Sequence, residues 1–151
     1  MKIWLAGKMS GLTFDQMNAW RINATRLLRI ASDNKIQTIN PCDYYNFKMS
    51  PNTYTENEVM EFDLHMVKAS DLILVNLENP NSIGTAIELY YAHDILNKPV
   101  IGYGLNETNL CHPLNETNLC HPWMKLCLTK ECKTLEQAID YIVNFYLPNL
   151  Q

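Results

Sequence analysis

Three carboxylates in the middle of the chain have the chemistry of a reactive site. Asp63 lies in a predicted helix, Asp71 immediately precedes an apolar run, and Glu88 lies in the helix predicted after that run. A carboxylate near a glycine and small polar residues can act as a nucleophile or as a general acid or base. The alternative is that Asp71 only begins a strand and that the other two are solvated helix residues. We expect all three to lie near one edge of a sheet.

A loop near the N-terminus offers hydrogen-bond donors to an anion. Gly7, Lys8 and Ser10 belong to a segment that a second glycine closes at Gly11. Such a loop can bind an anion through its backbone N–H groups, and the Lys8 and Ser10 side chains add further donors. The segment lacks the G-x-x-x-x-G-K-[ST] spacing of a Walker A loop.

The stretch between the second and third carboxylates predicts a strand, a turn and a helix. Residues 72–75 are uniformly apolar, which is typical of a parallel strand buried on both faces. Turn residues follow, then Ser82 or Asn81 can cap the next helix, and Gly84 allows a ligand to approach the backbone closely. Ligands gather at such strand-to-helix turns in open α/β sheets.

The rest of the chain alternates strands with helices. This order predicts an α/β fold with a mostly parallel sheet, helices on both faces and right-handed crossovers. Residues 42–55 read as a loop. The expected strands are 2–6, 36–39, 72–75, 100–103 and, weakly indicated, 123–128; the expected helices run from Thr13 or Asp15 to about 30, over 56–70, from the cap near 82 to about 96, and over 134–147.

Length and composition favour one folded domain over residues 1–151. The hydrophobic fraction of 47% is too high for a disordered chain, and the net charge of −4 argues against a dedicated nucleic-acid-binding protein. No apolar run approaches a membrane span, and the first apolar segment is too short for a signal peptide. Five cysteines without a secretory signal favour reduced thiols, so we expect a cytoplasmic protein.

A nine-residue segment, LNETNLCHP, occurs twice in tandem over residues 105–113 and 114–122. Two short copies are too few for a solenoid, and a duplication within a surface loop explains them best. The repeat also creates a possible zinc ligand set, but no C-x-x-C pair is present and the duplication itself generates four of the six residues, so we expect no metal site. The six residues are Cys111, His112, Cys120, His121, Cys127 and Cys132.

Taken together, these stretches resemble the nucleoside 2-deoxyribosyltransferase family. The resemblance covers about residues 1–103 and implies a flavodoxin-like, Rossmann-like three-layer sandwich with a five-stranded sheet. It also implies cleavage of the N-glycosidic bond of 2'-deoxynucleosides without a cofactor or metal, in a homo-oligomer whose neighbouring subunit often completes the site. The matching residues are Ile3 to Gly7, Asp63, Asp71 to Val75, Gly84 to Leu89, Ala92 and Lys98 to Val100.

The resemblance also implies roles for the three carboxylates. Glu88 matches the nucleophile, Asp63 matches the acid that handles the base and its proton, and Asp71 matches a frequent acid at the start of the strand. Deoxyribose would pass to a second base in a transferase or to water in a hydrolase. Aromatic side chains that could stack on a base are Trp20, Tyr44 and Tyr45.

One departure concerns the substrate's 5' end. Family members that act on free nucleosides often carry Asp where this chain has Ser82, whereas the related 2'-deoxynucleoside 5'-monophosphate N-hydrolases bind phosphate with a neutral hydroxyl there. A carboxylate would repel phosphate, while a hydroxyl and a helix N-terminus attract it. Lys8 and Ser10 would then join the phosphate site. A non-catalytic nucleotide-binding module remains a third possibility.

Overall fold

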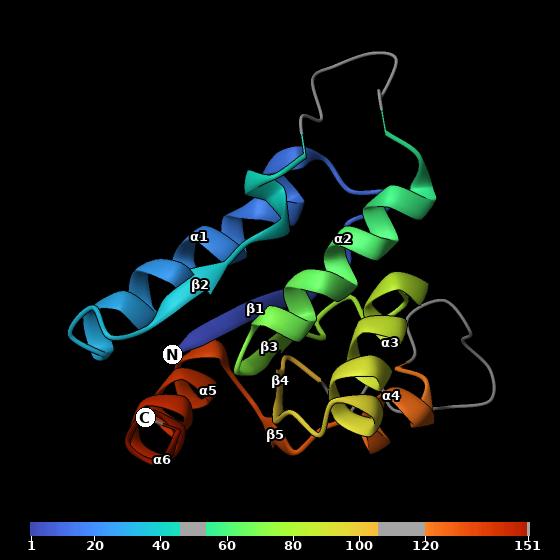
Figure 1. Ribbon diagram of the computed structural model, residues 1–151. Coiled ribbons are helices and arrows are strands. Elements are labelled where there is room, and N and C mark those ends of the chain that lie inside the picture. Colours follow the sequence, from blue (N-terminus) through green and yellow to red (C-terminus); the bar gives the residue numbers. More distant parts are fainter. Residues whose placement is uncertain (46–53, 106–119, 151) are drawn as a thin grey trace.

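The computed structural model describes residues 1–45, 54–105 and 120–150 of the chain. Five parallel strands form one sheet in the order β2-β1-β3-β4-β5 (Figure 1). This is the α/β architecture expected from the alternating pattern. The strands are β1 (Lys2–Gly7), β2 (Gln37–Ile39), β3 (Leu72–Asn76), β4 (Val100–Tyr103) and β5 (Lys130–Cys132).

Helices cover both faces of the sheet and complete three layers. One face packs against α1 (Phe14–Ala31) and α5 (Leu135–Tyr141), and the other against α2 (Glu56–Ala69), α3 (Ile83–Tyr90) and α4 (Pro122–Leu126) (Figure 1). Shorter segments continue or connect these elements: the 3-10 helix η1 (Pro41–Asp43), the π-helical turns η2 (Tyr91–Ile95) and η4 (Ile142–Tyr146), and α6 (Leu147–Asn149).

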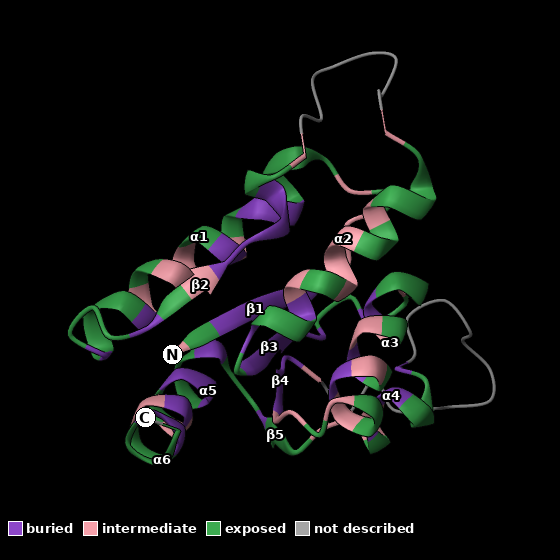
Figure 2. Ribbon diagram, viewed as in Figure 1, coloured by how far each residue is buried: buried purple, intermediate pink, exposed green. Residues whose placement is uncertain are grey.

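The central strands are buried on both faces because their side chains alternate between two apolar clusters. Ile3 and Leu5 of β1 point to the cluster under α1 and α5, whereas Trp4 and Ala6 point to the cluster under α2 and α3. Every residue of β3 is buried (Figure 2). The sheet therefore fixes the carboxyl ends of β1 and β3 rigidly beside each other.

Local capping chemistry sets the starts of the helices, largely as predicted. Thr13 and Thr55 each form a capping box at the start of α1 and α2. Ser82 caps α3, with its hydroxyl accepting from the Thr85 N–H, and Thr134 caps α5.

The predicted fifth strand at 123–128 is wrong. His121 caps a helix there, Pro122 occupies its first turn, and the buried residues Met124 and Cys127 recur at helical spacing. A short apolar run fits either a helix or a strand, and here packing against the sheet decides. The fifth strand is instead β5, a short edge strand that starts with two exposed charged residues.

Most of the tandem repeat, residues 106–119, lies outside the described residues, so its expected loop structure stays a prediction. Within the described residues, no helix is both long enough and apolar enough to span a membrane.

Candidate active site

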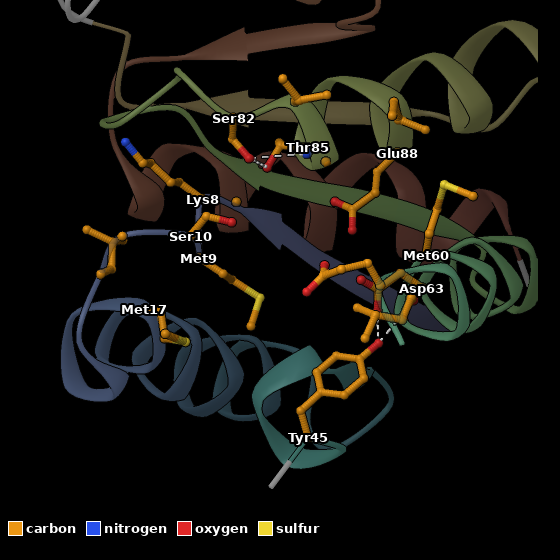
Figure 3. A pocket seen from close by; sticks show the side chains of 18 of the residues that line it. Lys8, Met9, Ser10, Met17, Tyr45, Met60, Asp63, Ser82, Thr85 and Glu88 are labelled. Atoms are coloured by element: carbon orange, nitrogen blue, oxygen red, sulfur yellow. Dashed lines mark hydrogen bonds between the residues drawn. The ribbon is translucent and has the colours of Figure 1, made fainter. Parts of the chain in front are cut away.

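A cavity of about 750 Å³ opens beyond the carboxyl ends of β1 and β3. It lies between the loop after β1, the N-terminal half of α2 and the first turns of α3 (Figure 3). Its volume is within the range of small-molecule sites, and its position is the switch point at which parallel sheets bind ligands.

Seven of the eight predicted site residues line this cavity, although they come from three separate segments. Figure 3 shows Lys8, Ser10 and Ser82 at one end, and Glu88 and Asp63 at the other. A Cβ atom added to Gly84 would meet no atom within 4 Å, so a ligand can reach the backbone of the first turn of α3. The seven lining residues are Gly7, Lys8, Ser10, Asp63, Ser82, Gly84 and Glu88.

Asp71 is the exception, and its predicted place beside the other two carboxylates is wrong. It precedes β3 and is exposed at the amino end of the sheet, where its carboxylate accepts the Lys2 N–H at 2.7 Å. The cavity lies past the other end of the same strand. Five residues of strand separate the two ends by about 16 Å. Asp71 therefore ties β1 to β3 and does not line the cavity.

Glu88 has a strongly perturbed carboxyl group. It is half-buried at the second turn of α3, and the desolvation of its carboxyl group, with the nearby Asp63 carboxylate, raises its pKa to about 8. Trp4 and Arg21 act in the opposite direction. The Trp4 indole N–H is buried without a hydrogen-bond partner among the described residues, yet it lies near enough to Glu88 to lower the carboxyl pKa.

Asp63 is the second perturbed carboxyl group. Burial raises its pKa to about 6, while a hydrogen bond from Tyr45 and the charge of Arg21 lower it. The Tyr45 hydroxyl donates to Asp63 Oδ1 at 2.5 Å (Figure 3), and burial together with this bond raises the tyrosine pKa. Two interacting carboxyls with separated pKa values titrate as a pair, so the pair holds about one proton near neutral pH.

The opposite end of the cavity is suited to an anion. The Ser82 hydroxyl accepts from Thr85 N at 3.3 Å and from Thr85 Oγ1 at 3.0 Å (Figure 3). Both of its acceptor positions are thereby used, which leaves its own hydrogen to be donated. The N-terminus of α3 and the Lys8 ammonium add positive charge at the same end.

Sequence reasoning missed Arg21 and placed two aromatic residues incorrectly. Trp20 and Tyr44 do not line the cavity, whereas Tyr45 does. Arg21 is fully buried at the helical spacing of the apolar residues Met17, Ala24 and Leu28. The sequence does contain a signal for this residue, because a charged arginine stands at a position of α1 where the helical repeat places buried apolar residues.

The described residues at this site do not form a metal-ligand set. Within residues 1–45, 54–105 and 120–150, no three His, Cys, Asp or Glu side chains are arranged to hold a metal ion. Cys120 and Cys127, from the candidate zinc set, are buried.

Comparison with known proteins agrees with this architecture. Three solved structures superpose on nearly the whole chain. A conserved protein from Enterococcus faecalis V583 has TM-score 0.72 and 16% identity, covering 95% of this chain and 97% of its own. A 2-deoxyribosyltransferase from Bacillus psychrosaccharolyticus has TM-score 0.68 and 18% identity, covering 99% and 96%. A 2-desoxiribosyltransferase from Leishmania mexicana has TM-score 0.70 and 21% identity, covering 97% and 99%.

At these identities the solved structures establish the fold alone. No curated protein sequence matches the chain significantly. The profile of the family described as nucleoside 2-deoxyribosyltransferase matches residues 3–138, which is most of the sequence and includes all three segments that line the cavity. The chain therefore belongs to the nucleoside 2-deoxyribosyltransferase family.

Proposed function

We propose that this protein cleaves the N-glycosidic bond of 2'-deoxynucleosides or their 5'-monophosphates, with Glu88 as the nucleophile. The observation that carries the proposal is the Glu88–Asp63 pair, which shares one proton near neutral pH at one end of a nucleoside-sized cavity. Glycosidic cleavage needs one ionised carboxylate and one proton donor, as in retaining glycosidases. The family match supports the assignment of attack to Glu88.

The reaction proceeds in two displacements. Because the Glu88 pKa is the higher of the two, the shared proton lies on Glu88 in the free site and must first pass to Asp63. Ionised Glu88 then forms a bond to C1' of the deoxyribose while the bond from C1' to the base breaks, and the base leaves with the proton now held by Asp63. Tyr45 orients Asp63 for this transfer. A second base or a water molecule then attacks C1', gives its proton to Asp63 and releases Glu88.

The test is product analysis with deoxynucleosides and their monophosphates, with and without an acceptor base. Glu88→Ala should lower kcat by orders of magnitude and abolish a 2-deoxyribosyl adduct seen by intact mass. Glu61→Ala, an exposed carboxylate of α2, is the matched control and should retain activity. A folded Glu88→Ala variant with near wild-type turnover would refute the nucleophile assignment. Free base without an acceptor indicates a hydrolase, and base exchange indicates a transferase.

We further propose that the preferred substrate carries a 5'-phosphate. Lys8, Ser10 and Ser82 stand opposite the carboxylate pair, where the 5' end of the sugar would lie if C1' meets Glu88. One charge-assisted hydrogen bond kept into the transition state favours the monophosphate in kcat/KM by roughly tenfold or more. Ser82→Asp should reverse this preference. If the wild type cleaves the free nucleoside with the higher kcat/KM, the preference for a 5'-phosphate is refuted. The proposal is then reduced to a deoxyribosyltransferase that acts on free nucleosides.

A non-catalytic nucleotide-binding module is the second candidate, and the anion-binding end of the cavity favours it. Such a module would bind the deoxynucleoside monophosphate and release no base. Calorimetric titration, run in parallel with the product analysis, distinguishes the binding module from the enzyme. If the wild type binds the monophosphate but releases no base, the enzymatic function is excluded.

We propose in addition that the protein is a homo-oligomer. The neighbouring helices α3 and α4 (Figure 1) carry exposed apolar side chains, and this exposed surface is here called the α3–α4 face. Two of its residues, Ile83 and Ile87, also line the cavity. A second copy placed on this face would cover the cavity. Sedimentation velocity tests this, and Trp123→Glu on the same face should shift the distribution toward the monomer.

A further inference from the structure

Arg21 is the one charged side chain that the described part of the core encloses completely. It lies on the inner face of α1, with no exposed surface, against the carboxyl end of β1. Arginine is seldom fully buried unless its charge and its donors have partners. Its position therefore needs a physical account beyond packing.

The Arg21 side chain donates hydrogen bonds to backbone carbonyls of β1 beyond the point where β2 pairs with that strand. β2 pairs with β1 only from Lys2 to Trp4, so the last residues of β1 have no strand partner on that side. Arg21 Nε donates to Leu5 O at 3.1 Å and Nη2 donates to Gly7 O at 2.8 Å, while Nη1 donates to Met17 O. The guanidinium thus satisfies the carbonyls at the point where the glycine loop departs from the sheet.

Among the described residues, no carboxylate lies at ion-pair distance from the Arg21 guanidinium. The ion pairs of the described residues are His93–Asp94 and Lys125–Glu131. The guanidinium lies over the Trp20 ring at 4.6 Å, a cation–π contact. Burial lowers its pKa, and the acidic groups that oppose this lowering are Cys42, Glu88, Tyr103 and Asp63. Arginine remains protonated even so.

We propose that Arg21 is a positioning residue with two tasks: it fixes the Gly7 carbonyl at the base of the anion-binding loop, and it supplies the buried positive charge that acts on Glu88 and Asp63. This deepens the proposed function, because the second task matters only if Glu88 must be ionised to attack. Four groups interact electrostatically or by hydrogen bonding with Glu88: Asp63 from α2, Tyr45 after η1, Trp4 from β1 and Arg21 from α1, whose guanidinium holds the Gly7 carbonyl at the edge of the same cavity. Arg21 is the only cation among them, so it offsets the repulsion between the two carboxylates.

Two substitutions separate the tasks. Arg21→Lys keeps the charge but loses the planar fork that holds two carbonyls, whereas Arg21→Met keeps the stem and loses both. Arg26→Met, an exposed arginine of the same helix, is the control. Arg21→Met should move the acid limb of the kcat/KM profile up by about one pH unit. Arg21→Lys should leave that limb in place. Both should speed amide hydrogen exchange of residues 8–11 at least several-fold and raise KM for the monophosphate.

A second readout does not depend on turnover. The Glu88 carboxyl can be titrated by NMR in protein labelled with ¹³C-glutamate and assigned with Glu88→Gln. An upward shift in Arg21→Met but not in Arg26→Met supports the proposal, and an unchanged titration overturns the electrostatic task. Unchanged exchange of the loop amides in Arg21→Lys overturns the anchoring task, even if Arg21→Met does not fold. A wild type without glycosidase activity refutes the proposed function, while the titration and exchange results still decide the role of Arg21.

Discussion

Replacing Glu88 with Gln should stabilise the protein, and the gain should grow with pH. Burial and Asp63 raise the Glu88 pKa from 4.5 to about 8. Between these values the folded protein holds a proton that the unfolded chain has released. The wild type therefore loses stability as pH rises through this window, and the full loss is present above the folded pKa. Glutamine keeps the shape of the side chain and has no proton to lose.

The size of the effect follows from the two pKa values. Each pH unit between them contributes about 1.4 kcal/mol, so the penalty grows from about 1 kcal/mol at about pH 5 to about 5 kcal/mol at about pH 8.5. Solvent in the open cavity screens the Glu88 charge, and Asp63 takes part in the same titration. Both effects reduce the expected increase in the stability penalty over this pH range to roughly 2–4 kcal/mol. For a domain of this size that corresponds to roughly 5–15 °C in Tm.

The assay is chemical and thermal unfolding of wild type, Glu88→Gln and the exposed control Glu61→Gln across this pH range. The difference in unfolding free energy between Glu88→Gln and wild type should be small near pH 5 and largest above pH 8, whereas Glu61→Gln should follow the wild type. A difference that stays within about 0.5 kcal/mol at all pH values would refute the view that Glu88 is desolvated.

Three further substitutions test separate parts of the site. Tyr45→Phe removes the donor to Asp63 and should raise the pKa of that carboxyl above about 6, seen in its ¹³C titration; an unchanged titration contradicts the hydrogen bond. Trp4→Phe removes the indole N–H that lowers the Glu88 pKa, so the acid limb of kcat/KM should move to higher pH, and a limb that stays in place excludes this contact. Asp71→Ala should cost about 1 kcal/mol in urea unfolding through the lost backbone contact yet leave kcat unchanged, and a large fall in kcat would return Asp71 to the site.

The sequence alone determined the α/β architecture and identified seven of the residues that line the cavity. Strand and helix periods are local properties, as are the caps at Thr13 and Ser82, so the alternating order and the element positions could be predicted. Because a parallel sheet brings its carboxyl ends to one edge, that order also places the Gly7 loop beside the start of α3.

Tertiary structure decided the rest, because it depends on which groups share space. Asp71 and Glu88 flank the same strand in sequence but lie at its opposite ends. Residues 123–128 have an apolar content that suits helix or strand, and only packing against the sheet selected the helix. Burial raises the Glu88 pKa, and Arg21 is enclosed by the core. Both depend on how the elements pack in the assembled fold, which no local sequence pattern contains.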